Sequence, residues 1–312
     1  MKHMQHFQKI LVGVDVLSRE NVVAPGSKNA VNQAIWLAKE TGGRLTILHS
    51  TWTDTYSDVV DGANVVKHIG LADEARVHLD ELVAEVEAQG LSCELRIESE
   101  RPWLALTRAA ITDGFDVVLV AKRNVADKDG SRRLGSVATK LLRKCPSAVW
   151  TVKPEHDLVM KLVLAATDLT AVGDQAVRYG AYITSKHGYE LHVLHAYQTP
   201  LQLQMEASTL SEDEYAARIE AIKSSAQSEI QGVLAGAELG SEPILHIGRN
   251  TPSIAIREAV EHLHPDLVVM GTISRAGVAG MLVGNTAEKL LARIDCSLLC
   301  VKPNDFVSTV AG

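Results

Sequence analysis

The stretch "GNTAEKLLARIDCSLLCVKP" at residues 284–303 decides the fold, because a close copy of it stands earlier in the chain. The copy is "GSVATKLLRKCPSAVWTVKP" at residues 135–154, and it keeps the opening glycine, the "KLL" step and the closing "VKP" without a gap. Just upstream, "DLVVMG" at 266–271 matches "DVVLVA" at 116–121. Matches that recur in one order indicate a duplicated structural unit.

Two further pairs extend the duplication to the front of each copy. The segment "ELHVLHA" at 190–196 matches "RLTILHS" at 44–50. The segment "LVLAATD" at 162–168 corresponds to "KILVGVD" at 9–15. Four matches in the same order predict two domains of one kind.

Each copy alternates short apolar runs with longer segments of helical periodicity. Strands that alternate with helices predict a parallel sheet that is covered by helices on both faces. We therefore predict an α/β protein of two tandem Rossmann-like domains, each with a five-stranded parallel sheet, at residues 1–154 and 155–312. The strands expected in the second copy lie near 161–167, 190–196, 241–247, 266–271 and 297–302. The "PGSKN" segment at 25–29 is expected to be a surface loop before the first helix.

The composition limits the classes of function and the compartment. A hydrophobic content of 46% with 22% charged residues is typical of a globular protein. The net charge of −7, without a basic stripe, argues against nucleic acid as a partner. The longest apolar runs are far shorter than the ~20 residues of a membrane-spanning helix, and the first residues lack the features of a signal peptide. The four cysteines form no C-x-x-C pair, which favours buried free thiols over a zinc site. We expect a cytoplasmic protein that contacts no membrane.

A ligand site is expected at the carboxyl ends of the strands, where open α/β sheets bind their ligands. In the second copy Asp168 follows the first strand, Ala196 ends the second, and Gly271 ends the fourth. A helix is expected to open near Gly284. Free backbone N–H groups at a helix start suit a phosphate group.

A ligand-free explanation of the same residues stays open. Glycines also make tight connections between strands and helices, and Asn285 or Thr286 is an ordinary residue at a helix start. Neither G-x-x-x-x-G-K-[ST] nor G-x-G-x-x-G occurs in the chain.

The segments "LVLAATD", "LHVLHA", "VVMGTISR" and "LVGNTAEKLL…LLCVKP" resemble the universal stress protein domain. The whole chain, from about residue 6 to about residue 304, resembles a tandem universal stress protein of the E type. The resemblance implies a stress-response protein with two Rossmann-like domains that are related by a pseudo-twofold axis and paired through their last strands. It also implies nucleotide binding.

The ATP-binding members of this family carry G-x-x-G, nine residues, and then G followed by Ser or Thr. The second copy has Gly271, Ser274 in place of the second glycine, Gly284, and Asn285 in place of the hydroxyl residue, with Thr286 next. By position in the family, the expected adenosine contacts are Asp168, Ala196 and Met270. The expected phosphate contacts are Gly271, Ser274, Gly284, Asn285 and Thr286.

The first copy departs further from the family pattern. Ala121 and Asn124 stand at glycine positions and the spacer is one residue longer, although Gly135 and Ser136 are kept. The positions that match the family's site are Asp15, Ser50, Val120, Gly135 and Ser136.

We expect a regulator that binds ATP or another nucleotide-like, phosphate-bearing ligand in the second domain, with Mg²⁺ only as a companion of the nucleotide. An interaction scaffold with decayed sites and a weak ATPase are the alternatives. No catalytic residue is predicted, because no general base, nucleophile or metal cluster stands out at the strand ends. No metal site of the protein's own is predicted either, because His192 and His195 point to opposite faces of a strand and cannot bind one ion. His49 and His195 are equivalent in the repeat, which suggests a shared structural role. A protein partner of unknown kind is expected, with the chain as a monomer of paired domains or as a homodimer.

Overall fold

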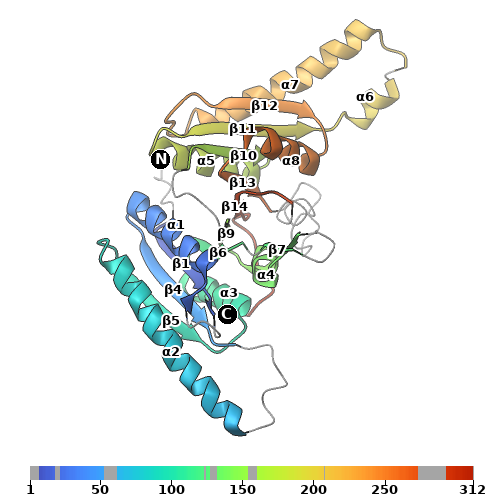
Figure 1. Ribbon diagram of the computed structural model, residues 1–312. Coiled ribbons are helices and arrows are strands. Elements are labelled where there is room, and N and C mark those ends of the chain that lie inside the picture. Colours follow the sequence, from blue (N-terminus) through green and yellow to red (C-terminus); the bar gives the residue numbers. More distant parts are fainter. Residues whose placement is uncertain are drawn as a thin grey trace. The chain divides into compact units, whose positions relative to one another are not determined.

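The computed structural model describes residues 7–17, 22–52, 62–122, 124–126, 132–153, 160–206, 208–272 and 293–311. The chain divides into two compact units (Figure 1). Unit 1 contains Met1–Leu158 together with Phe306–Gly312, and unit 2 contains Val159–Asp305. None of the described helices is both long enough and apolar enough to cross a membrane.

Unit 1 is built on a parallel sheet in the order β5-β4-β1-β6-β9. Its strands are β1 (Lys9–Val14), β4 (Arg44–Ser50), β5 (Cys93–Glu98), β6 (Val117–Ala121) and β9 (Ala148–Val152). Its helices are α1 (Pro25–Thr41), α2 (Gly62–Glu87), α3 (Pro102–Asp113) and α4 (Ser136–Lys144). Two short hairpins pair β2 (Val16–Leu17) with β3 (Val22–Val23), and β7 (Asn124–Ala126) with β8 (Arg132–Leu134).

The strand order of unit 1 fixes where its helices lie. Right-handed crossovers place the helices that lead from β1 toward β5 on one face, and those that lead toward β9 on the other. Accordingly α1 and α2 share one face, where Lys28 pairs with Glu85, while α3 packs against α4 (Figure 1). The direction of the connections reverses between β1 and β6, and this is the switch point at which open α/β sheets bind ligands.

Unit 2 repeats this plan in the order β12-β11-β10-β13-β14. Its strands are β10 (Leu162–Thr167), β11 (Glu190–Tyr197), β12 (Ile244–Arg249), β13 (Leu267–Gly271) and β14 (Ser297–Val301). Its helices are α5 (Ala171–Ser185), α6 (Leu201–Glu206), α7 (Glu212–Leu234) and α8 (Pro252–Leu263). Its core joins Val177 and Ala181 of α5 to Ile230 of α7, over Leu191 and Val193 of β11.

The prediction of two tandem Rossmann-like domains is confirmed, and two local expectations are wrong. Strand β12 begins at Ile244 rather than at 241, because Pro243 has no N–H to donate to a sheet. The "PGSKN" segment is not a surface loop. It forms the first turn of α1, with Pro25 at the first helical position, where the missing N–H carries no penalty. The helix start expected near Gly284 lies outside the described residues.

Candidate functional site

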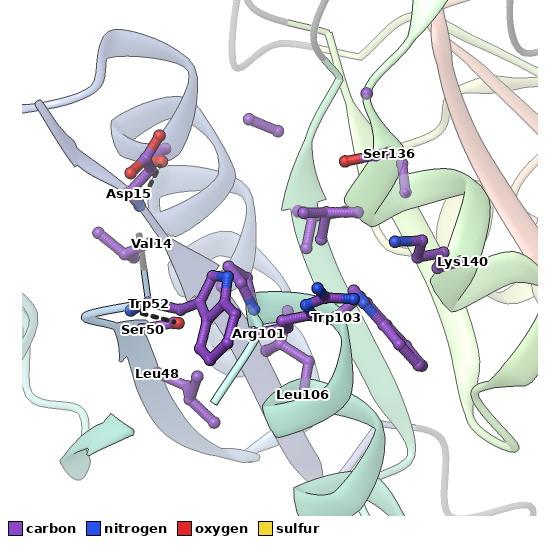
Figure 2. Close-up of a pocket in the computed structure, with 18 residues that line it drawn as sticks. Val14, Asp15, Leu48, Ser50, Trp52, Arg101, Trp103, Leu106, Ser136 and Lys140 are labelled. Carbon is purple, nitrogen blue, oxygen red and sulfur yellow. Dashed lines mark hydrogen bonds between the residues drawn. The ribbon is translucent and has the colours of Figure 1, made fainter. Parts of the chain in front are cut away.

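A cavity of about 650 Å³ opens in unit 1 beside the switch point (Figure 2). Its wall is formed by the carboxyl ends of β1, β4 and β6 and by the first turns of α1, α3 and α4. The structure brings together around it all five first-copy positions derived from the family pattern, namely Asp15, Ser50, Val120, Gly135 and Ser136. Asp15 lies on one side of the cavity, and Ser136 and Lys140 lie on the other (Figure 2).

The turn after β1 is fixed by two contacts that the fold supplies. The backbone N–H of Asp15 donates to Oγ of Ser27, at 2.9 Å, and Ser27 is a buried residue of the first turn of α1. One residue earlier, the carbonyl of Val14 lies 3.0 Å from Nδ1 of His49. A carbonyl only accepts hydrogen bonds, so Nδ1 of His49 is the donor and carries a proton. These contacts hold the Asp15 side of the cavity.

The start of α4 forms the opposite side. Gly135 is the residue before the helix, and as a glycine it has no side chain that could cap it. Ser136, Val137 and Ala138 of the first turn line the cavity, so their part of the helix brings free N–H groups and the positive end of the helix dipole to it. Lys140, one turn further, adds a full positive charge to the same wall. This side suits an anion.

Aromatic rings and cations meet in the rest of the wall. The guanidinium carbon of Arg101 lies 5.2 Å from the ring centroid of Trp52. Nζ of Lys140 lies 5.3 Å from the ring centroid of Trp103. Both distances are those of cation–π contacts. Leu48 and Leu106 add apolar surface, so the cavity combines flat apolar walls with positive charge.

Ser27, Trp52, Arg101, Trp103 and Lys140 were not predicted from the sequence, because the predicted positions came only from the strand ends and the family pattern. A comparison of the differences between the two copies would have found two of them. Helices α3 and α8 both begin with proline, and α8 has Thr251 and Ser253 where α3 has Arg101 and Trp103. All four tryptophans of the chain lie in unit 1, and Trp52 and Trp103 are the two that line its cavity.

In unit 2 the described part of the predicted site lies along one edge of the sheet. The register pairs Thr167 with His195 and Ala166 with Met270, so Asp168 follows level with Ala196, while Gly271 stands level with Thr167. Met270 is buried in the sheet. The remaining predicted positions lie outside the described residues, namely Ser274, Gly284, Asn285 and Thr286.

The carboxylate of Asp168 takes part in the start of α5. Its Oδ1 accepts hydrogen bonds from the backbone N–H of Thr170, at 3.2 Å, and from the Thr170 hydroxyl. Oγ1 of Thr170 in turn accepts from the N–H of Gly173, at 3.3 Å, and so caps the helix. Asp168 thus has a structural role at the start of α5.

The histidines of unit 2 have structural partners. Nδ1 of His195 lies 3.0 Å from the Thr167 carbonyl, the same bond that His49 makes in unit 1, as their equivalence in the repeat suggested. Nδ1 of His192 lies 2.8 Å from Nε2 of His246 on the neighbouring strand. Burial, and then the nearby His192, lowers the pKa of His246. Within the described residues no three His, Cys, Asp or Glu side chains are placed to hold a metal ion.

The sequence and the fold of the chain are both similar to those of universal stress proteins. The model of the universal stress protein family matches residues 6–153 and again residues 160–302. The chain is 24% identical over 322 aligned residues to universal stress protein E of Escherichia coli K12, with 98% of both chains covered. A functionally unknown protein from Pseudomonas aeruginosa has the same fold, with a TM-score of 0.69 at 19% identity over 97% of this chain and 95% of that one. A universal stress protein from Archaeoglobus fulgidus gives 0.65 at 20% identity, over 95% and 98%.

Proposed function

The chain belongs to the universal stress protein family, and on this basis we propose that it binds a nucleotide or a related phosphate-bearing ligand and acts as a sensor or regulator in the stress response. The observation that carries the proposal is the cavity of unit 1, where the start of α4 and Lys140 face Asp15 across apolar walls. A site with an anion-binding end and a flat apolar surface fits a ligand that joins a phosphate to a ring system.

Different residues of the unit 1 cavity would contact different parts of the ligand. The first turn of α4, from Ser136, and the ammonium of Lys140 would hold the phosphate. Trp52 and Trp103 offer ring faces for a flat group. Asp15 would accept hydrogen bonds from hydroxyl or amino groups at the other end of the ligand. ATP would supply both parts, with its triphosphate at the start of α4 and its adenine ring against the tryptophans. Mg²⁺ would then be bound to the phosphates.

The proposal extends to unit 2 with a different set of residues. Asp168, Ala196 and Gly271 stand at the corresponding edge of the sheet, and Ser274, Gly284, Asn285 and Thr286 would complete the phosphate side. Unit 2 has Thr251 and Ser253 in place of Arg101 and Trp103, so the two units would differ in ligand preference. No disulfide bond joins the four cysteines, all of which lie among the described residues, and this fits a reducing compartment such as the cytoplasm.

Isothermal titration of the purified protein with ATP tests the proposal for unit 1. The variant Lys140→Glu reverses the charge beside the start of α4 and should weaken ATP binding at least tenfold, which corresponds to about 1.4 kcal/mol. The matched control is Lys39→Glu, at the far end of α1, and it should bind as the wild type does. Equal affinity of wild type and Lys140→Glu would exclude the cavity as the phosphate site.

A binding curve with two classes of site would also be informative. If only the weaker class changes in Lys140→Glu, that class belongs to unit 1 and the other to unit 2. If the wild-type protein binds neither ATP nor AMP, the function proposed here is wrong, and the scaffold hypothesis takes its place.

A further inference from the structure

The segment Phe306–Ala311, called the strap below, follows unit 2 in the chain but belongs to unit 1. Its residues alternate in exposure. Phe306, Ser308 and Val310 are half-buried, and the residues between them are exposed. Val307, for example, is 84% exposed. This alternation is typical of an extended segment that lies with one face against a protein surface.

The first set of strap contacts reaches α4. The hydroxyl of Ser308 donates to the backbone carbonyl of Lys144 at 2.7 Å. Lys144 is the last residue of α4, and the last carbonyls of a helix have no partner within the helix. Ser308 therefore caps α4 from a distant part of the chain.

The side chain of Lys144 connects the strap to the cavity. Its Nζ lies 3.5 Å from Oγ1 of Thr309 in the strap. The same Nζ lies 5.4 Å from the ring centroid of Trp103, and that ring lines the cavity. Strap, Lys144 and cavity wall thus form a continuous chain of contacts.

The second set of contacts reaches α3. Nε of Arg108 donates to the backbone carbonyl of Ala311 at 3.4 Å, and the guanidinium of Arg108 forms an ion pair with Glu100. The carbonyl of Glu100 accepts a hydrogen bond from the hydroxyl of Ser50, which lines the cavity. The strap therefore supports the cavity wall at two separate points.

We propose that the strap sets the ligand affinity of the unit 1 cavity by holding α3 and α4 in the arrangement that forms its wall; the inference rests on the proposed function of that cavity. Among the described residues that line the cavity, none comes from the strap, so the strap acts through Trp103 and Ser50 and does not compete with the ligand. Without it, ligand binding has to order the wall first, and that requirement weakens affinity.

The experiment compares the full chain with a chain that ends at Asp305 and with three single variants, in titrations with ATP. Loss of the strap should raise Kd about tenfold, and Ser308→Ala about threefold, because each hydrogen bond contributes modestly. Ser308→Thr keeps the hydroxyl and should restore near wild-type affinity. Val307→Ser changes an exposed strap residue and is the matched control. Hydrogen–deuterium exchange of residues 101–108 and 136–144 should quicken in the shortened chain and in Ser308→Ala.

The outcomes separate this inference from the proposed function. If the ATP binding that Lys140→Glu weakens is equally tight in the full chain, in the shortened chain and in Ser308→Ala, the strap proposal is overturned and the unit 1 site stands. If the full chain does not bind ATP, both fall together. Should the shortened chain fail to fold, the contrast between Ser308→Ala and Ser308→Thr decides, since equal affinity of the two contradicts a role for the capping hydroxyl.

Discussion

A Cβ atom on Gly271 would stand 2.8 Å from Cγ1 of Val172, so the end of β13 can meet the start of α5 only because one of the two residues is glycine. In unit 1 the glycine of the corresponding pair lies on the helix and not on the strand. There the strand ends in Ala121 and the second residue of the helix is Gly26, where an added Cβ would come within 3.1 Å of the alanine Cβ. One position in each pair must be small, and the glycine of the family pattern at 271 has a packing reason of its own.

We expect Gly271→Ala to lower the free energy of unfolding by about 1–3 kcal/mol, because it forces an extra methyl group into a filled contact. The double variant Gly271→Ala/Val172→Ala should recover most of the loss, since the second change removes the methyl groups that clash. Urea unfolding of the two single variants and the double variant measures the coupling.

The control for this cycle is Gly248→Ala in β12, where an added Cβ meets nothing within 4 Å. A Gly271→Ala variant as stable as Gly248→Ala would contradict the packing account. For the same reason Gly271→Val is a poor probe of ligand binding. The disturbed contact with α5 would by itself be enough to abolish binding.

The start of α5 gives a second prediction. Thr170→Ala removes both the helix cap and a hydrogen bond to Asp168, and should lower the free energy of unfolding by about 1 kcal/mol. Thr170→Ser keeps the hydroxyl and should lose much less. Thr251→Ala is a matched control, because Thr251 stands before α8 without a capping hydrogen bond from its side chain. Thermal unfolding in which Thr170→Ala and Thr251→Ala behave alike would refute this.

The pair His192–His246 predicts a dependence of stability on pH. Burial, with the nearby His192, lowers the pKa of His246 in the folded protein below its unfolded value near 6.5. The unfolded chain then binds more protons, so stability falls as pH drops below about 6.5. His246→Gln, which cannot titrate, should show a shallower fall. Urea unfolding between pH 7.5 and pH 5 checks this, and identical profiles of the two proteins would count against it.

The fold was predictable from the sequence because its signals are local and occur twice. The runs "KILVGVD" and "LVLAATD" share a length and a place, and the alternation of strands with helices leaves little choice of topology. Contacts between distant residues were not predictable in this way. Gly271 is predicted from the family pattern as a phosphate contact, and nothing in the sequence says that Val172 packs against it.

The candidate site was likewise predictable only in part. The positions Asp15, Ser50 and Ser136 came from the repeat and a family pattern, and they do line one cavity. Trp103 and the strap were missed for different reasons. Trp103 is replaced by Ser253 in the second copy. The strap lies beyond the last repeated segment, so its attachment to unit 1 depends on tertiary contacts that no periodicity records.

The most direct test of the account uses the four tryptophans of the chain, at positions 36, 52, 103 and 150. Protein labelled with ¹⁵N only in tryptophan gives one indole N–H signal for each, and each can be assigned by single Trp→Phe variants. On titration with ATP we predict shifts of the Trp52 and Trp103 signals, which report on the cavity wall, and little change at Trp36 and Trp150. Four unmoved signals at millimolar ATP, or equal shifts in all four, would contradict ligand binding in the cavity of unit 1.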